Sequence, residues 1–142
     1  MRRPRHVRPP EHVAAALRAV LGSAVEGVGI VEHSWLTRLH GRAVATTRRQ
    51  RIYLRGSARE FFANPWLMLH EYCHVLHQWQ PGRLSVPRYL LECARHGYWN
   101  NRFEVEAREF ADRRLPELHA QLKARSPEQR LAPVEARGNE GQ

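Results

Sequence analysis

The spacing of apolar residues predicts a helix followed by extended segments in the first half of the chain. Apolar side chains recur at helical intervals over 11–22, and Gly22 is a typical C-terminal stop. The segment 25–33 is predicted to be a short buried strand, and 34–41 a short helix. Two apolar, β-branched runs over 43–55 flank a polar turn, which predicts a β-hairpin.

The second half of the chain is predicted to be helical. One helix begins at Asn64-Pro65, because proline suits the first helical turn, and it ends at the QPG sequence over 80–82. Two more helices are predicted, over 87–96 and 102–123, with a loop over 97–101. The order of a helix, mixed strands and then helices predicts an α+β fold.

These elements lie within one predicted domain over 11–123. The basic, proline-rich segment 1–10 is expected to be disordered, and the polar segment 124–142 is expected to be a flexible C-terminal tail. A chain of 142 residues suits one domain with a modest core. Disorder of the whole chain is excluded by a hydrophobic content of 42%.

The net charge of +9 favours nucleic acid, anionic membranes or acidic proteins as partners. The basic residues are scattered along the chain rather than clustered, and no DNA-reading motif is recognisable, so nucleic acid is not the favoured partner. No segment has the apolar length of a membrane span or of a secretion signal. We therefore expect a cytoplasmic location by default, with signal-independent export as the alternative. Two cysteines make no disulfide framework and leave the redox compartment open.

The helix predicted after Asn64 carries the sequence His70-Glu71-Tyr72-Cys73-His74, which fits H-E-x-x-H. Residues four apart share a helix face, so His70 and His74 can both bind one Zn²⁺ ion. Glu71 lies about 100° round the helix. From there it can reach a water molecule on the metal and act as a general base. The alternative is a core helix whose histidines have ordinary hydrogen-bond partners.

A third ligand is expected from the helix over 102–123, which offers Glu104, Glu106 and Glu109. A histidine soon after the motif is excluded, because the required position holds Gln80. Glu104 falls within the predicted buried stripe of the helix, whereas the other two glutamates fall on its solvated side. A buried carboxylate is costly unless it is paired or binds metal, so Glu104 is the predicted ligand. A buried salt bridge is its alternative role. The stripe comprises Phe103, Ala107, Phe110, Ala111, Leu115, Leu118 and Leu122.

Tyr98 and His96 are weaker candidates for catalysis, because they precede the Glu104 helix and could donate a hydrogen bond to an oxyanion. A structural role is the alternative for both residues. Cys73 is expected to face away from the metal. His77 is expected to be a partly exposed polar residue, with an outer-shell contact as the alternative.

The motif followed by a helix with the sequence E-x-E-A resembles the gluzincin metallopeptidases. This resemblance implies that the first glutamate, Glu104, is a zinc ligand. Many relatives have Asp or Asn where this chain has Arg108, and arginine cannot accept a hydrogen bond from a ligand histidine.

The chain resembles more closely the small zincin-like core domain, or mini-gluzincin, of extracellular contractile injection systems and related bacterial proteins. The similarity covers roughly 11–112 and rests on VGIVEHS, GRAVATTRRQRIYL and LMLHEYCHVLHQ in that order. It implies a short mixed sheet packed on the H-E-x-x-H helix, with further helices after it. In zincin-like folds an edge strand binds the substrate backbone, and 51–55 is the candidate for this strand. An ordinary sheet strand is its alternative role.

The leading functional hypothesis is a zinc-dependent metallopeptidase that hydrolyses a peptide or protein substrate through a metal-activated water. One alternative is a non-catalytic, zinc-stabilised binding or scaffold module associated with an injection system or an effector. A nucleic-acid-associated protein is the other alternative.

Overall fold

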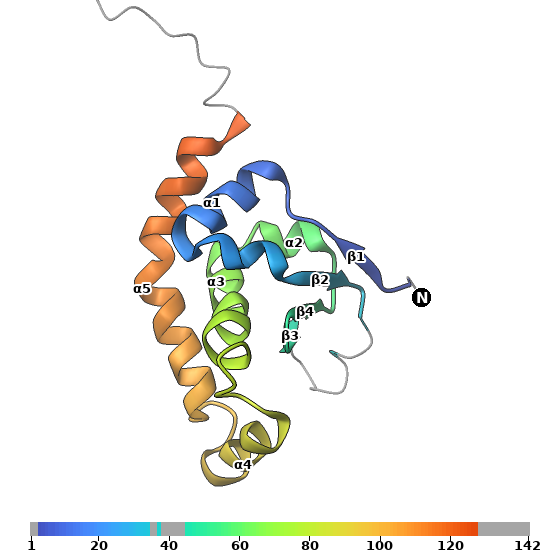
Figure 1. Ribbon diagram of the computed structural model, residues 1–142, viewed down its shortest axis with the longest axis vertical. Helices are drawn as coiled ribbons and strands as arrows, with labels where there is room; N and C mark the ends of the chain where they lie inside the picture. The colour runs from blue at the N-terminus through green and yellow to red at the C-terminus, as the bar shows by residue number, and fades with distance from the viewer. Residues whose placement is uncertain (1–2, 35–36, 38–44, 128–142) are drawn as a thin grey trace, which may run out of the picture.

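The computed structural model describes residues 3–34, 37 and 45–127 (Figure 1). Most of the short helix predicted over 34–41 and most of the predicted tail lie outside these ranges. The strands are β1 (Arg5–Val7), β2 (Gly29–Glu32), β3 (Ala45–Arg48) and β4 (Arg51–Leu54). The helices are α1 (Glu11–Leu21), the 3₁₀ helix η1 (Ser23–Gly27), α2 (Ala58–Phe62), α3 (Pro65–Cys73), the π-helical η3 (His74–Trp79), α4 (Val86–His96) and α5 (Arg102–Arg125).

The fold is a small α+β domain, as predicted. Its sheet is mixed and has the strand order β1-β2-β4-β3, with β2 and β4 parallel and the other two pairs antiparallel. Helices α3 and α5 lie side by side, and α1 crosses α5 near its C-terminal half (Figure 1). The apolar core fills the space between the sheet and these three helices, and its fully buried members include Leu17, Ile52, Met68, Leu69 and Leu118.

The expectation that 1–10 is disordered is wrong for 5–7, which form β1. This strand pairs with β2 so that Arg5 lies opposite Glu32. The buried Glu32 carboxylate accepts hydrogen bonds from the Arg5 side chain at 2.8 Å and from the Ala58 backbone amide at 2.9 Å. A three-residue strand is too short to show an alternating pattern, and the carboxylate that holds it lies far along the chain.

The strand predicted over 25–33 is shorter than expected. Its first part is the 3₁₀ helix η1, and extended structure begins only at Gly29. The chain enters this turn through Gly22, whose φ of 89° suits glycine. The turn leaves only four residues for β2, of which Ile30, Val31 and Glu32 are buried.

The hypothesis that 51–55 is an edge strand for substrate is also wrong. Strand β4 lies between β2 and β3 and pairs with both of them, so its backbone has no free edge for a peptide. The predicted hairpin itself is confirmed as β3 and β4. The sequence does not show the crossover that brings β2 alongside β4. Because of this crossover, β3 rather than β4 lies at the edge of the sheet.

Candidate metal centre

Helix α3 begins where the sequence predicts. The Asn64 side chain accepts a hydrogen bond from the Leu67 amide at 3.0 Å, and Pro65 occupies the first turn. The helix then presents His70 and His74 on one face, each no more than 7% exposed. At His74 the α-helix changes to the π-helical turn η3, a distortion that is frequent at functional sites.

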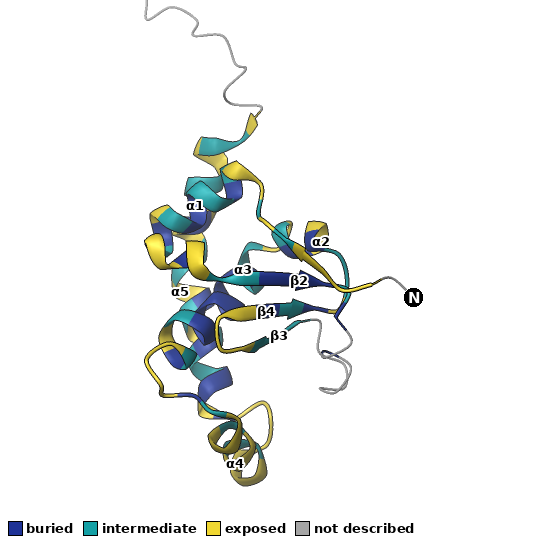
Figure 2. Cartoon of the chain, turned by 45° about the vertical axis from the view of Figure 1, so that its right-hand side comes forward, coloured by how far each residue is buried: buried dark blue, intermediate teal, exposed yellow. Residues whose placement is uncertain are grey.

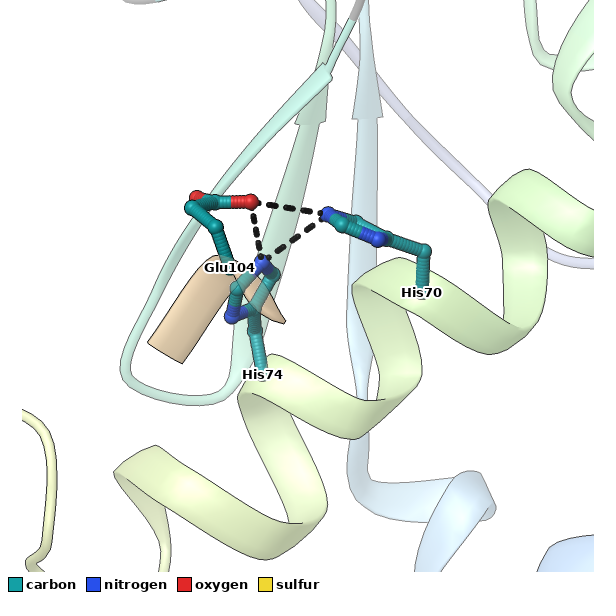
Figure 3. A group of neighbouring side chains, drawn as sticks. All are labelled: His70, His74 and Glu104. Carbon is teal, nitrogen blue, oxygen red and sulfur yellow. Dashed lines mark hydrogen bonds and ion pairs between the residues drawn. The ribbon is translucent and has the colours of Figure 1, made fainter. Parts of the chain in front are cut away.

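His70, His74 and Glu104 converge in the structure (Figure 3). Glu104 Oε2 lies 3.1 Å from His70 Nε2 and 3.5 Å from His74 Nε2. The two Nε2 atoms are 3.1 Å apart. Ligands at about 2.0–2.1 Å from a tetrahedral zinc ion lie about 3.3 Å from one another, so the three atoms have the separation that one ion requires. The cluster can hold a metal ion.

The glutamates of α5 have different surroundings. Glu104 enters the cluster and is 5% exposed. Glu106 makes two hydrogen bonds of 2.7 Å with the Arg83 guanidinium, and Glu109 is exposed. The Asn101 side chain caps this helix by accepting a bond of 2.9 Å from the Phe103 amide, which determines where Glu104 lies on the first turn. Helical periodicity therefore distinguishes the three glutamates correctly by position.

Gln78 determines which nitrogen of His74 carries its proton. The Gln78 amide NH₂ group donates to the Phe103 carbonyl at 2.9 Å, so its oxygen is the atom that faces His74 Nδ1 at 2.7 Å. An amide oxygen only accepts, so Nδ1 must be the donor, and the neutral ring then has its lone pair on Nε2. This tautomer directs into the cluster the nitrogen that is able to bind a metal ion. Gln78 is fully buried, and the sequence analysis assigned it no role.

The electrostatics of the cluster favour a cation. The two Nε2 atoms face one another so closely that a proton or a metal ion must lie near them to relieve lone-pair repulsion. Burial opposes the charged form of Glu104, but hydrogen bonds from His70 and His74 outweigh it and hold the pKa of Glu104 well below its usual range. Burial lowers the pKa of His74, yet the bond to Glu104 and its charge raise it to about 9. At neutral pH the ring therefore carries a proton on Nε2 as well as on Nδ1, and a bound metal ion would replace the Nε2 proton and leave the neutral form described above. Positive charge is thus stabilised at this point.

Glu71 lies beside the cluster. It is 5% exposed, and its Oε2 atom is buried without a hydrogen-bond partner among the described residues. Burial raises the pKa of Glu71, while the nearby rings of His74 and His70 lower it. A buried carboxyl with an unpartnered oxygen and a raised pKa has the properties of a group that exchanges a proton.

The structure distinguishes between the two weaker catalytic candidates. Tyr98 lies near the cluster: desolvation and the Glu104 carboxylate raise its pKa to about 12. His96 is half exposed and faces Glu92 at 4.0 Å, and no described contact links it to the cluster. Tyr89, which the sequence analysis did not consider, donates a hydrogen bond of 2.7 Å to Glu104 Oε1. The sequence around Tyr89 contains no pattern that predicts this contact, because the contact depends on how α4 lies against α5.

The remaining predicted positions lie outside the cluster. Cys73 is a buried free thiol, and His77 is exposed with its ring 5.0 Å from that of Phe110. Arg108 does not contact a ligand histidine. It donates to the Trp99 carbonyl, and its guanidinium stacks on the Trp99 ring at 3.9 Å. Arg108 therefore contacts the loop after α4 instead.

None of the helices in the described part of the chain combines the length and the apolar character needed to cross a bilayer. Comparison of the chain with protein-family models, with curated proteins and with solved structures finds no match in any of the three.

Proposed function

We propose that this protein is a zinc-dependent metallopeptidase of the gluzincin type, with His70, His74 and Glu104 as metal ligands. One observation carries the proposal: the three ligand atoms lie 3.1–3.5 Å apart, and Gln78 holds His74 in the tautomer that binds metal. A histidine with an ordinary structural role in a core does not require that a second histidine nitrogen and a carboxylate oxygen converge with its own nitrogen on one point.

The donor set favours zinc over other divalent ions. Two imidazole nitrogens and one carboxylate oxygen are typical of catalytic zinc sites, whereas Mg²⁺ and Ca²⁺ prefer sites made of oxygen atoms. No fourth histidine, cysteine, aspartate or glutamate joins the cluster among the described residues. Three protein ligands leave a coordination position for substrate or water, which is the arrangement of a catalytic site rather than of a closed structural one.

The surrounding residues have the groups that peptide hydrolysis requires. When bound, a zinc ion supplies Lewis acidity that polarises a carbonyl group and promotes ionisation of water. Glu71 accepts the proton of the attacking water and delivers it to the leaving amine, for which its buried carboxyl is suited. Tyr98 donates a hydrogen bond to the developing oxyanion. Tyr89 and Gln78 hold Glu104 and His74 in place.

An extended polypeptide is the substrate class that the fold favours. Within the described residues, strand β3 pairs only with β4, and its Thr47 hydroxyl accepts a hydrogen bond of 3.3 Å from Trp79 at the end of η3. A terminal strand beside the metal-site helices can bind a peptide backbone by strand addition. This role, predicted for 51–55, therefore belongs to Ala45–Arg48 in the proposal.

The decisive experiment combines zinc content with hydrolysis of a quenched fluorescent peptide library. We expect stoichiometric zinc in the wild type and in Glu71→Gln, but hydrolysis only in the wild type. Removal of a general base typically costs about 10²–10⁴-fold in rate. Glu109→Gln, a matched change at an exposed glutamate of α5, should retain both properties. Absence of zinc from the wild type, or equal activity of Glu71→Gln, contradicts the proposal.

A structural metal is the second candidate, and the burial of the cluster favours it. All three ligands are at most 7% exposed, and they join α3 to α5 across the core. An ion here would stabilise a small domain whether or not it catalyses a reaction. The metal is structural if the zinc-loaded protein hydrolyses no peptide and if removal of the zinc with a chelator lowers its melting temperature.

A further inference from the structure

The large exposed apolar side chains of the described chain lie in one short segment. They belong to α4 and to the loop that follows it, and α4 has no buried residue (Figure 2). Large apolar side chains that are exposed next to one another are typical of an interaction site. We call this group the α4 surface, and its residues are Val86 (45% exposed), Leu90 (60%), Leu91 (48%), Tyr98 (58%) and Trp99 (67%).

Helix α4 is amphipathic, but its apolar side faces outward. Tyr89, Glu92 and Cys93 are its half-buried residues, and they contact the start of α5: Asn101 donates hydrogen bonds to the Tyr89 carbonyl and to the Cys93 sulfur. Leu90 and Leu91 point the other way. A helix that served only to cover the core would bury its leucines and expose its glutamate. The outward leucines therefore require an external partner to be buried.

The loop after α4 extends this surface to the metal cluster. Arg108 stacks under the Trp99 ring and bonds to its backbone carbonyl, so Trp99 is held in an ordered position although its side chain is mostly exposed. The Glu104 carboxylate contributes, after burial, to raising the pKa of Tyr98, the preceding residue. Tyr89, on the inner side of α4, donates a hydrogen bond to the same carboxylate. A chain lying on the α4 surface would thus be adjacent to the cluster.

The charges around the surface identify the sign of its partner. The single carboxylate of α4, Glu92, faces Arg102 at 3.5 Å and His96 at 4.0 Å. Arg88 donates hydrogen bonds to backbone carbonyls, and Arg108 stacks on Trp99. Among the described residues, no carboxylate lies within ion-pair distance of Arg88, Arg95 or Arg108. Three guanidinium groups without a carboxylate partner thus border the leucines and Trp99, so the complementary partner is anionic.

We propose that the α4 surface binds an acidic polypeptide through its apolar side chains and presents that polypeptide to the metal cluster as substrate. The substrate part of this inference rests on the proposed peptidase function. A polypeptide fits better than a lipid surface because the helix that carries the surface also contacts the cluster, through the hydrogen bond from Tyr89 to Glu104. Its mixture of tryptophan, tyrosine and arginine is also that of protein-binding hot spots.

The test measures binding by fluorescence anisotropy to the full chain carrying Glu71→Gln, which prevents turnover. The probe is a fluorescein-labelled peptide with leucine and phenylalanine interspersed among glutamates. Matched probes have lysine in place of glutamate, or serine in place of the apolar residues. We expect binding of the first probe only, and a loss of about tenfold or more on the double substitution Leu90→Ser with Leu91→Ser. Both leucines are exposed, so the fold should tolerate the change.

A charge reversal provides the matched control. Arg95→Glu and Lys123→Glu change the net charge equally, but only Arg95 lies one turn from Leu91. Arg95→Glu should weaken binding several-fold and Lys123→Glu should not. Equal effects of the two changes, or equal binding of all three probes, overturn the inference.

Two other occupants would overturn it in recognisable ways. Cosedimentation with phosphatidylserine vesicles that needs Leu90 and Leu91, without peptide binding, would assign the surface to a membrane. Light scattering that shows a wild-type dimer and a monomeric double variant, again without peptide binding, would assign it to a second copy.

The peptidase proposal and this inference fail separately. If the wild type cleaves peptides and the double substitution leaves KM unchanged, the α4 surface is not the substrate site and the peptidase proposal stands. If the protein binds the acidic probe through α4 but cleaves none, the peptidase proposal fails and the binding surface stands.

Discussion

The cluster of His70, His74 and Glu104 and the α4 surface depart in opposite ways from the usual division between an apolar interior and a polar exterior. His70, His74 and Glu104 are polar and at most 7% exposed, whereas Leu90 and Trp99 are apolar and at least 60% exposed. Each arrangement is unfavourable in isolation: a buried charge needs a partner, and an exposed apolar group gains free energy once it is covered.

The two regions are also neighbours, since Tyr89 of α4 donates a hydrogen bond to Glu104. The buried core between the sheet and helices α1, α3 and α5 follows the usual division. Residues of both kinds thus meet where Tyr89 contacts Glu104, whereas the buried Glu32, which binds Arg5 and Ala58, is a separate case. The meeting of the two kinds is expected where binding energy, rather than folding, determines the choice of residue.

The largest effect is expected at the cluster, from removal of a ligand. Glu104→Ala should lower zinc affinity by more than the roughly 100-fold that marks loss of an outer-shell contact, because the ligand itself is removed. Glu106→Ala should leave affinity nearly unchanged, since Glu106 pairs with Arg83. Competition with a chromophoric chelator measures both variants. Similar losses in the two would show that the cluster is not the zinc site.

The same substitution at a buried and at an exposed leucine tests the comparison directly. Leu118→Ala on α5 should lower the free energy of unfolding by about 2–5 kcal/mol, because it leaves a cavity in a fully buried position. Leu90→Ala should change it by no more than about 0.5 kcal/mol. Urea denaturation measures both values. A large loss for Leu90→Ala would mean that α4 packs into the fold and offers no binding surface.

A smaller effect is expected from the residues that orient the ligands. Gln78→Leu should weaken zinc binding by roughly 10–100-fold, because His74 loses the partner that selects its tautomer. Tyr89→Phe should have a smaller effect, since Glu104 keeps its contacts with both histidines. The exposed Gln80, changed to leucine, is the matched control for Gln78. Unchanged affinity in Gln78→Leu would contradict the role assigned to this amide.

The smallest effect concerns Glu32, a buried carboxylate outside the cluster. The Ala58 amide, and after it Arg5, lower its pKa in the folded state, against the effect of burial. The ionised group therefore stabilises the fold above about pH 4.5, and this contribution disappears as pH falls toward the lower folded-state pKa. Glu32→Gln should cost about 1 kcal/mol at pH 7 in the free energy of unfolding, with the difference narrowing below about pH 4.

Denaturation of Glu32→Gln across this pH range is compared with that of Glu60→Gln, an exposed glutamate of α2 that should show little change. A constant difference between wild type and Glu32→Gln at every pH would show that the charge of Glu32 does not contribute. The result sharpens the comparison, because it tests whether a buried carboxylate here can serve folding alone.

Most helices and the hairpin could be predicted, because their signals are local. Asn64-Pro65 marks the start of α3, and the spacing of His70 and His74 places both rings on one face. The stripe that begins at Phe103 places Glu104 inside the fold. These inferences need only the helical repeat and the cost of burying a carboxylate.

Features that depend on distant pairing could not be predicted. Strand β1 has three residues and forms because β2 offers an edge and Glu32 binds Arg5. Strand β4 becomes internal because β2 pairs with it in parallel after a crossover. Neither partner is marked in the local sequence, so local patterns predict disorder over 1–10 and an edge strand over 51–55.

The sequence by itself determined the chemistry available to this protein: two histidines at helical spacing, a glutamate between them and one carboxylate on a buried stripe. Tertiary structure alone decided how that chemistry is held. Gln78 reaches the Phe103 carbonyl only because α3 and η3 lie along α5, and Tyr89 reaches Glu104 only because α4 turns its polar side inward. A helical repeat specifies which residues share a face, but the packing of helices decides what that face meets.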